Sequence, residues 1–493
     1  MILGYIWLEI GHIFCTFLGY SVAFDVPSTL MQEVHVALPS GYSQSFSVLP
    51  HYKVEDLRIS AQGSFGQNFL RLVFQGQVLE DLQLLQDVGL KDGDHLAAIA
   101  QEIQVASTSR AFALWYAAGN RFVTWGHNRS GGDMHEVHHL LMNVQEVASS
   151  LHAFAAVLTN GHVITWGHLV DGPLQKSIAQ LQVKRIRATD RAFAAILEDG
   201  SVVAWGHDSF GADTSKVQDQ LEDVQQIQAT QNSFAVIRAD GAVVTWGDKG
   251  CGGDSSNVQG QLRNVEKLHS TYSAFAAILE DKSVATWGDP YCGGDSSQVQ
   301  YELRNVQQIQ AAGGAFAALR VDGSLVTWGD PDGGGDSSAV QHLRNVQQIR
   351  ASYLAFAAIV TDGSVVSWGY GPYGGDSSTV QDQLRNVQQI EATNYAFAAL
   401  ADGSVVTWGD RDFGGDSSMV QEQLRNVRQI HATNFAFLAI LSDGSVVTWG
   451  DAKSGGDSSK VQSLLSTLTL TEEEHMLKYK EFVALGDPFY DLI

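Results

Sequence analysis

The nonapeptide DGSVVTWGD occurs at residues 402–410 and again at residues 443–451, and this repetition constrains the fold more than any other feature. Seven further Trp-Gly pairs precede these two copies, and consecutive pairs stand 39 to 41 residues apart. The nine repeated tryptophans are Trp125, Trp166, Trp205, Trp246, Trp287, Trp328, Trp368, Trp408 and Trp449. A fixed period of this length indicates a repeat architecture, in which each unit buries its apolar surface against its neighbours.

One repeat, residues 387–426, contains three strand-like runs, QQIEAT, YAFAAL and SVVTW. Asp402-Gly403 separates the last two runs and predicts a tight turn. The adjacent Val405 and Val406 must point to opposite faces of their strand, so both faces of the sheet have to be covered. Alanines in the middle run keep that strand thin where neighbouring sheets approach. Small sheets that repeat radially and cover one another form a β-propeller.

The connector between repeats, GGDSSMVQEQLRNV, predicts one or two helical turns, with a short fourth strand as the alternative. An aspartate recurs in this connector in six repeats, as Asp254, Asp295, Asp336, Asp376, Asp416 and Asp457. Each loop offers one carboxylate, whereas calcium takes six to eight oxygen ligands, so we expect turn or cap formation and no metal site. His135 and His139 are likewise expected to lie on a solvated helical face.

The repeat resembles that of the regulator-of-chromosome-condensation family, with a V-x-x-I strand, a short apolar strand, Asp-Gly and a strand ending in Trp-Gly. Its length is similar to that of the compact three-stranded blades of the bacterial β-lactamase-inhibitory propeller. The resemblance spans about residues 103–465 and implies a mostly β fold, a propeller of nine repeats. Members usually close with seven blades. Nine repeats leave open a closed ring, an open spiral, or a seven-bladed ring with two units outside it.

Residues 31–101 lack the repeat and read as two strands around Pro39-Ser40-Gly41, a helix and two further strands. This ββαββ pattern covers one face of a sheet with one helix. The segment resembles ubiquitin-like domains in RLVFQGQVLED at 71–81 and GLKDGDHL at 89–96, with Met31-Gln32 at its start.

The ubiquitin-like resemblance implies a β-grasp fold and a protein-binding patch formed by Leu38, Val73 and Ile99. The alternative is that these three are ordinary half-buried sheet residues. The chain continues through Ala100-Gln101 into the repeats without a terminal Gly-Gly. We therefore expect a fixed docking module for ubiquitin-pathway receptors, and no release as a modifier.

The two ends of the chain differ from both repeated and ubiquitin-like parts. Residues 1–30 are apolar, but Glu9 and His12 interrupt the run and no Lys or Arg precedes Lys53, so we expect a dispensable leader in preference to a membrane anchor or secretory signal. Residues 467–493 contain a capping-box pattern and predict a C-terminal helical tail. The predicted organisation is 1–30 leader, 31–101 ubiquitin-like domain, 102–466 propeller and 467–493 tail.

Charge and cysteine content narrow the function. The formal net charge of −24 argues against a nucleic-acid binder, and three cysteines in 493 residues suit a reducing compartment, cytoplasmic or nuclear. No phosphate-binding loop or converging catalytic set is recognisable, so we expect no enzyme activity and no cofactor. The segments after each Trp-Gly vary most, and we expect them to gather on one strongly acidic face that favours a basic partner.

These features favour a non-enzymatic interaction scaffold, in which the ubiquitin-like module docks on ubiquitin receptors and the propeller face binds a client protein. The alternative is a guanine-nucleotide exchange regulator of a small GTPase, because the repeat family includes such a factor. A membrane-tethered role depends on residues 1–24 being retained.

Overall fold

A computed structural model gives the fold for residues 8–9, 12–17, 20–24, 31–65, 70–79, 81, 83–100, 103–116, 122–168, 181–336, 338 and 340–465. The chain divides into two compact units, one centred on residues 31–100 and the other on residues 103–465. Each unit is described by itself.

The smaller unit is a five-stranded mixed sheet in the order β5-β4-β8-β6-β7, and its two central strands β4 and β8 run parallel. Valines and leucines alternate along these strands, which places Val34, Leu72 and Leu96 against Leu57 of the helix α1. The elements are β4 (Gln32–Ala37), β5 (Ser43–Val48), α1 (Val54–Phe65), β6 (Leu70–Phe74), β7 (Gln77–Val78), α2 (Leu85–Val88) and β8 (His95–Ala100). This is the predicted β-grasp arrangement, to which the structure adds the short β7 and α2.

Three short antiparallel strands precede the β-grasp sheet, in the region predicted as an apolar leader. They are β1 (Leu8–Glu9), β2 (His12–Phe17) and β3 (Tyr20–Phe24). Within the part of the chain that the structure describes, no helix is long and apolar enough to span a bilayer. The predicted C-terminal tail, 467–493, lies outside the described residues, which end with α4 (Gln462–Leu465).

Nine three-stranded antiparallel sheets, which we call blades 1 to 9, form the larger unit. Blades 1 to 3 are β9 (Ile103–Ser107), β10 (Ala111–Tyr116) and β11 (Phe122–Gly126); β12 (Val144–Ser149), β13 (Ala153–Leu158) and β14 (Val163–Gly167); β15 (Val183–Ala188), β16 (Ala192–Leu197) and β17 (Val202–Gly206). Blades 4 to 6 are β18 (Val224–Ala229), β19 (Ser233–Arg238) and β20 (Val243–Gly247); β21 (Val265–Ser270), β22 (Ala274–Leu279) and β23 (Val284–Gly288); β24 (Val306–Ala311), β25 (Ala315–Arg320) and β26 (Leu325–Gly329). Blades 7 to 9 are β27 (Val346–Ala351), β28 (Ala355–Val360) and β29 (Val365–Gly369); β30 (Val387–Ala392), β31 (Ala396–Ala401) and β32 (Ser404–Gly409); β33 (Val427–Ala432), β34 (Ala436–Leu441) and β35 (Val446–Gly450).

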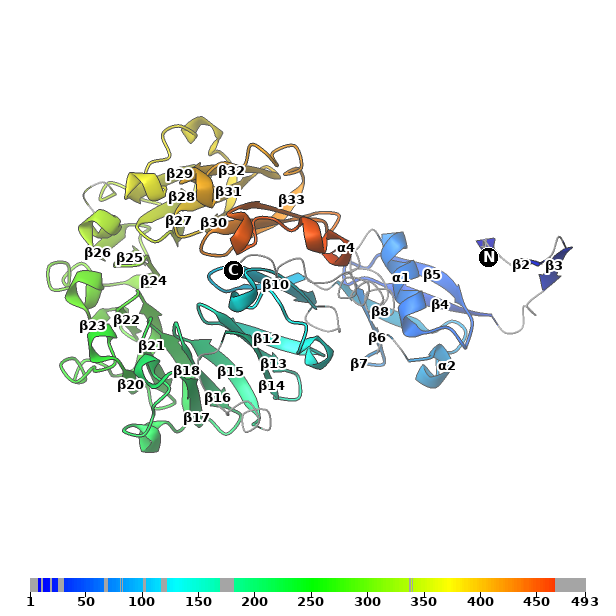
Figure 1. Ribbon diagram of the computed structural model, residues 1–493, viewed down its shortest axis with the longest axis horizontal. Helices are drawn as coiled ribbons and strands as arrows, with labels where there is room; N and C mark the ends of the chain where they lie inside the picture. Colours follow the sequence, from blue (N-terminus) through cyan, green and yellow to red (C-terminus); the bar gives the residue numbers. More distant parts are fainter. Residues whose placement is uncertain are drawn as a thin grey trace. The chain divides into compact units, whose positions relative to one another are not determined.

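The nine blades form a closed ring (Figure 1), with the first strand of each blade innermost. The seam between blade 9 and blade 1 shows the closure. There, the Trp125 Nε1–H donates to the Gly455 carbonyl at 3.0 Å, and the Ser107 hydroxyl donates to the Ala432 carbonyl at 2.8 Å. The first bond repeats the one from Trp408 Nε1 to the Gly374 carbonyl (2.9 Å) inside the ring. The chain is therefore a nine-bladed β-propeller, and the open spiral and the seven-bladed ring are excluded.

Each blade hides its apolar surface only against the next one. Ala396 and Ala398 of blade 8 are fully buried against Phe437 and Trp449 of blade 9. Trp449 in turn stacks on Phe437, with ring centroids 5.2 Å apart and planes 21° from parallel. Burying one large apolar side chain stabilises the fold by about 1.5–3 kcal/mol, so the repeated Trp–Phe–Ala layer provides most of the cohesion between blades.

The glycine after each tryptophan is required by its backbone. Gly409 has φ of +103°, and a Cβ there would lie 2.6 Å from the Tyr395 carbonyl oxygen. Only glycine accepts this conformation and this close approach without strain. The Trp-Gly signature therefore combines a packing residue with the turn that follows it.

The connectors contain turns and single 3₁₀ turns, such as η5 (Gln218–Gln220) and η11 (Gln381–Gln383). The predicted helical turns are therefore closer to the structure than the alternative of a short fourth strand. The Asp416 carboxylate accepts a hydrogen bond from the Ser418 N–H at 2.9 Å, which is the predicted turn-forming role. Ser417 donates to Gln421 Oε1 (2.8 Å), and the Gln421 amide donates to the Val405 carbonyl (3.1 Å). Equivalent glutamine bonds tie the connectors after blades 3, 4, 5, 7, 8 and 9 to the outer strand of the preceding blade.

Candidate protein-binding site

Each blade sends two segments to the same face of the ring. These are the turn between its first and second strands and the segment after its Trp-Gly. Hydrogen bonds join the two segments in each blade, as where Thr230 Oγ1 donates to the Cys251 carbonyl and Thr271 Oγ1 to the Cys292 carbonyl, both at 2.9 Å. We call this surface the turn face, and we call the opposite surface, with the tight turns between second and third strands, the hairpin face. The variable segments that the structure describes therefore gather on one face, as predicted; the segment after His168 in blade 2 lies outside the described residues.

Backbone hydrogen bonds link the nine turns of the turn face around the axis. Asp190 N–H donates to the Gln231 carbonyl, and Gln231 N–H donates to the Tyr272 carbonyl, both at 2.9 Å. Eight such bonds, 2.8–3.3 Å long, connect in order Ser109, Leu151, Asp190, Gln231, Tyr272, Gly313, Tyr353, Asn394 and Asn434. Because each turn is fixed by the next, the side chains at this position are held in defined places around the channel mouth.

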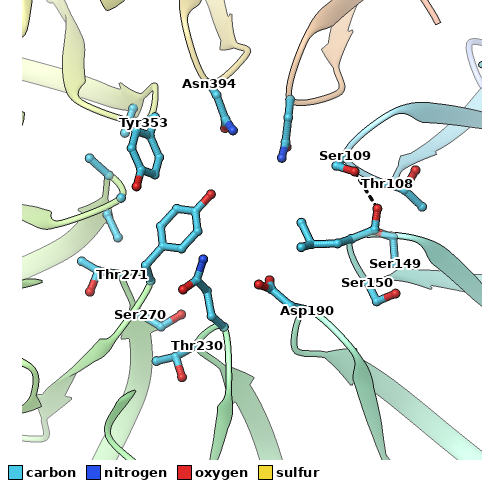
Figure 2. A pocket seen from close by; sticks show the side chains of 18 of the residues that line it. Thr108, Ser109, Ser149, Ser150, Asp190, Thr230, Ser270, Thr271, Tyr353 and Asn394 are labelled. Carbon is cyan, nitrogen blue, oxygen red and sulfur yellow. Dashed lines mark hydrogen bonds between the residues drawn. The ribbon is translucent and has the colours of Figure 1, made fainter. Parts of the chain in front are cut away.

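A cavity of about 400 Å³ opens at this mouth and is lined by residues of all nine blades. Figure 2 shows the carboxylate of Asp190 and the amide of Asn394 directed toward its centre, with Tyr353 at its edge. The lining is mostly hydroxyl, amide and small side chains, and Asp190 is the one charged residue among the lining residues.

Two kinds of ionisable group in the cavity are perturbed by burial. Desolvation raises the pKa of the Asp190 carboxyl to about 6, although the nearby Arg191 opposes the shift. Burial raises the pKa of the Tyr272 hydroxyl to about 12, with further contributions from Tyr353 and Asp190. The rings of Tyr272 and Tyr353 are nearly perpendicular, with centroids 5.0 Å apart. The cavity lining therefore includes one partly desolvated carboxylate and a pair of neutral tyrosine rings.

An aromatic cluster lies on the turn face over blades 7 to 9. Tyr395 is its centre, with ring centroids at 4.6 Å from Tyr373, 4.7 Å from Phe413 and 5.7 Å from Phe435. The Arg110 guanidinium of blade 1 lies 5.4 Å from the Phe435 ring. These four aromatic side chains are half-buried. Aromatic rings with arginine at a partly exposed surface are the composition typical of protein–protein hot spots.

Charge is divided around the turn face, in contrast to the strongly acidic face that we predicted. The residue after Trp-Gly is Asp248, Asp289 or Asp330 in blades 4 to 6, as expected, but His127, His168 or His207 in blades 1 to 3. The first three turns also contain basic or imidazole side chains, namely Arg110, His152 and Arg191. The prediction is therefore wrong for blades 1 to 3. The signal was present in the sequence, at two positions that become visible once the repeats are aligned on Trp-Gly.

Burial favours the neutral form of two histidines of this sector, His127 and His152. Burial lowers the pKa of His152, and the Arg191 guanidinium lowers it further. His127 is affected in the same way by burial and by Arg110. Arginines therefore supply the positive charge of blades 1 to 3, next to the aromatic cluster. His207 keeps the capping role of the aspartates, since its Nδ1 accepts from the Ser209 N–H at 3.2 Å.

The candidate patch of the β-grasp unit has two members on one face. Val73 stands opposite Ala97 and Ile99 opposite Arg71, on the side of the sheet away from the buried Leu72 and Ala98. Ile99 is 42% exposed and Val73 is half-buried. Leu38, in the turn after β4, packs partly against the core. The patch remains a prediction.

The repeated tryptophans lie between blades, with 2–5% of their surface exposed. They hold the ring together and do not form part of the turn face. His138 of the histidine-rich connector is buried, and this burial lowers its pKa to about 4. Among the described residues, no group of three or more metal-ligating side chains lies together.

Comparisons with known proteins find solved structures at low identity and low TM-score. No family model and no curated protein sequence matches the chain. Among solved structures, the CRINKLY WD40 ectodomain of the Arabidopsis thaliana receptor kinase ACR4 is 18% identical with a TM-score of 0.32, covering 54% of this chain and 96% of its own. Prp20p from Saccharomyces cerevisiae, described with its binding properties to Gsp1p and histones, is 14% identical with a TM-score of 0.35, covering 55% and 84%. A Caldiarchaeum subterraneum ubiquitin is 21% identical with a TM-score of 0.14, covering 15% and 95%.

Proposed function

We propose that this protein is a non-enzymatic interaction scaffold that holds a client protein on the turn face of its propeller and docks on ubiquitin-pathway receptors through its β-grasp unit. The observation that carries the proposal is that the largest variation between repeats falls in the segments of one face of the ring. A constant scaffold that presents varied side chains at one surface is the usual construction of a recognition surface.

The client-binding half is supported by the composition of the turn face. It combines a half-buried aromatic cluster around Tyr395, arginines in blades 1 to 3 and carboxylates in blades 4 to 6. Opposite charges on two sectors favour a client with complementary charges and fix its orientation on the ring.

The docking half rests on the ubiquitin-like sequence resemblance and on the shared outward face of Val73 and Ile99. A β-grasp sheet that exposes an aliphatic patch offers a receptor a small apolar surface. In this proposal the protein acts in the cytoplasm or the nucleus, where such receptors occur.

Affinity purification of the full chain with two variants tests the two halves separately. Val73→Asp places a charge in the docking patch, and Val321→Asp is its matched control, because Val321 is 69% exposed on the hairpin face. Ubiquitin-receptor partners should disappear with Val73→Asp and remain with Val321→Asp. If Val73→Asp keeps those partners, the docking half of the proposal is wrong.

The client half is tested with Tyr395→Ala against Met419→Ala, a change of a 93% exposed residue in a connector. Removing a hot-spot aromatic typically weakens binding by about 2 kcal/mol or more, roughly thirtyfold. We expect the recovery of client proteins to fall with Tyr395→Ala and to stay unchanged with Met419→Ala. Equal recovery of all partners by both variants would contradict the client half of the proposal.

The alternative function is regulation of nucleotide exchange on a small GTPase, which follows from the repeat resemblance. Nucleotide release from a panel of small GTPases separates it from scaffolding, because only an exchange regulator accelerates release. Acceleration that Tyr395→Ala abolishes would replace the scaffold proposal with this one.

A further inference from the structure

We propose that the channel mouth of the turn face is a socket for one aliphatic cation, a primary ammonium or a guanidinium, with Asp190 as its counter-ion. The proposal deepens the proposed function and rests on it, since the natural source of such a group is a lysine or arginine side chain of the client. The socket is defined by Asp190, Tyr272, Tyr353, Asn394 and Gln231, all of which line the cavity.

The first argument is the state of the Asp190 carboxylate. It is the one charged group of the lining, and within the described residues it accepts no hydrogen bond from a side chain or a backbone N–H. A carboxylate that is partly removed from water without a partner is unfavourable. The raised pKa of this group, about 6, expresses the same cost. An incoming cation would compensate for the lost hydration and stabilise the ionised form.

The second argument is the set of groups that line the same cavity as that carboxylate. The rings of Tyr272 and Tyr353 lie in van der Waals contact range of one another, and Asn394 and Gln231 add amide oxygens. Aromatic faces attract alkylammonium and guanidinium ions by roughly 0.5–2 kcal/mol, and amide oxygens accept their N–H groups. An anion would find the carboxylate repulsive and few N–H donors, because the turn N–H groups are already bonded around the ring.

The third argument concerns the other charges near Asp190. Arg191 is the adjacent cation, and its guanidinium lies 5.2 Å from the Phe210 ring, where it has its own aromatic partner. Tyr272 stays protonated at neutral pH, because its pKa is raised to about 12. His152 lies near Arg191 in the neighbouring turn, and its lowered pKa keeps it neutral near pH 7. The carboxylate is therefore left as the dominant charge of the mouth at pH 7.

The size of the mouth is consistent with a single side chain. The volume of about 400 Å³ is at the lower end of the usual range for ligand sites. It is large enough for a butylammonium or butylguanidinium group with a few waters. The backbone bonds between neighbouring turns hold the main chain of these five residues in place, which lowers the ordering cost of binding.

Ligand-observed NMR titration of the full chain with n-butylammonium and n-butylguanidinium, and with butyrate as the anion, tests the socket. The two cations distinguish lysine-like from arginine-like occupants. We expect binding of at least one cation at pH 7.5, and weaker or no binding of butyrate. Tighter binding of butyrate, or no binding of either cation up to 50 mM (about 1.8 kcal/mol at 1 M standard state), would overturn the proposal.

Asp190→Asn removes the charge at constant shape, and Asp332→Asn is the matched control, an exposed carboxylate on the same face in blade 6. Asp190→Asn should weaken cation binding at least tenfold, whereas Asp332→Asn should change it less than twofold. Circular dichroism checks that each variant is folded. Equal affinities of the wild type and Asp190→Asn would refute the assignment.

The pH dependence provides a test that needs no variant to fold. At pH 5 a carboxyl group with a pKa of about 6 is mostly protonated, so cation binding by the wild type should fall about tenfold from pH 7.5. Protonation of His152 acts in the same direction, and the pH profile of Asp190→Asn measures that contribution separately. Affinity that is unchanged between the two pH values would contradict the role of Asp190.

Failure of the socket and failure of the scaffold give different results. If Asp190→Asn still recovers every client while Tyr395→Ala loses them, the scaffold stands and the socket is not used. If butylammonium binds at Asp190 but no client is recovered, the socket stands and the scaffold proposal fails.

Discussion

The hairpin face and the turn face are built by the same repeat, yet they differ in how much they vary. On the hairpin face, the Asp362 carboxylate accepts hydrogen bonds from the N–H and the hydroxyl of Ser364 at 2.9 and 2.6 Å. The same pair of bonds recurs at Asp199, Asp281, Asp322 and Asp443. On the turn face, the equivalent positions range from arginine to aspartate and from glycine to tyrosine.

This difference shows that the hairpin face and the turn face are subject to different structural constraints. A tight turn between two strands needs a specific local geometry, so five of the described hairpins keep the same Asp and Ser. The turn face is fixed instead by backbone bonds between neighbouring turns, which place few demands on the side chain, although a Cβ at Gly313 would lie 2.7 Å from the Tyr353 ring. Side chains there are free to differ, and the binding properties of the ring are expected on that face.

The largest expected effect breaks the layer that both faces share. Trp408→Ala removes a stacked ring and the hydrogen bond from its Nε1 to the Gly374 carbonyl. Large-to-alanine changes in a core cost about 3–5 kcal/mol, so the midpoint of chemical denaturation should fall strongly. Met419→Ala, at a 93% exposed position, should leave the midpoint within experimental error. Equal midpoints for the two variants would show that the tryptophan layer does not hold the blades together.

The second effect concerns the inner strands, between the two faces. Burial lowers the pKa of His269 and of His431 to about 4, and an unfolded histidine titrates near 6.5. Between pH 6.5 and pH 4 the unfolded chain binds more protons, so the folded state loses stability as the pH falls through this window. Glutamine stands at the same position in blades 4 and 6, as Gln228 and Gln310.

The double variant His269→Gln/His431→Gln should therefore lose less stability than the wild type on going from pH 7 to pH 5. The expected difference is about 3 kcal/mol for the two residues together. Denaturant unfolding at both pH values measures it. A wild type that is equally stable at pH 5 and pH 7 would contradict the burial of neutral imidazoles.

The third effect is confined to the hairpin face. Asp362→Ala removes the two hydrogen bonds to Ser364 from one turn. Loss of such a turn-forming side chain costs about 1 kcal/mol, and client binding should be unchanged. A loss of client binding with this variant would show that the hairpin face also belongs to the recognition surface.

The smallest effect on stability is expected on the turn face. His207→Asp gives blade 3 the residue that blades 4 to 6 have at this position. Because aspartate accepts the same kind of N–H bond, as Asp248 does from Gly250 at 2.7 Å, stability should change by less than about 0.5 kcal/mol. Thermal melting tests this prediction, and a larger loss would mean that the imidazole has a packing role.

The repeat made most of the fold predictable from the amino-acid sequence. The positions of Asp402-Gly403 and Trp408-Gly409 located a hairpin and the end of an outer strand, and both predictions are confirmed. Ring closure was not predictable, because it depends on small angles between blades that no single residue encodes. The seam contact between Trp125 and Gly455 joins positions 330 residues apart and appears only once the ring exists.

The candidate site was less predictable than the fold. The sequence indicated that varied segments share a face, but Asp190 carries no local motif. It stands in the first-to-second-strand turn, where other repeats have serine, leucine, glutamine, tyrosine, glycine or asparagine. Its significance comes from desolvation at the centre of the ring, which is a property of nine turns together. The placement of these histidines and arginines in blades 1 to 3 could have been predicted from the sequence, because it is visible once the repeats are aligned on Trp-Gly.

The seam at Trp125 and Gly455 also has a consequence for biosynthesis. During translation, blade 1 emerges first and leaves one apolar edge without a neighbour until blade 9 has left the ribosome. The incomplete propeller therefore exposes an apolar, aggregation-prone sheet surface throughout elongation. Chaperones that shield nascent chains should matter more for this protein than for domains that complete their cores early.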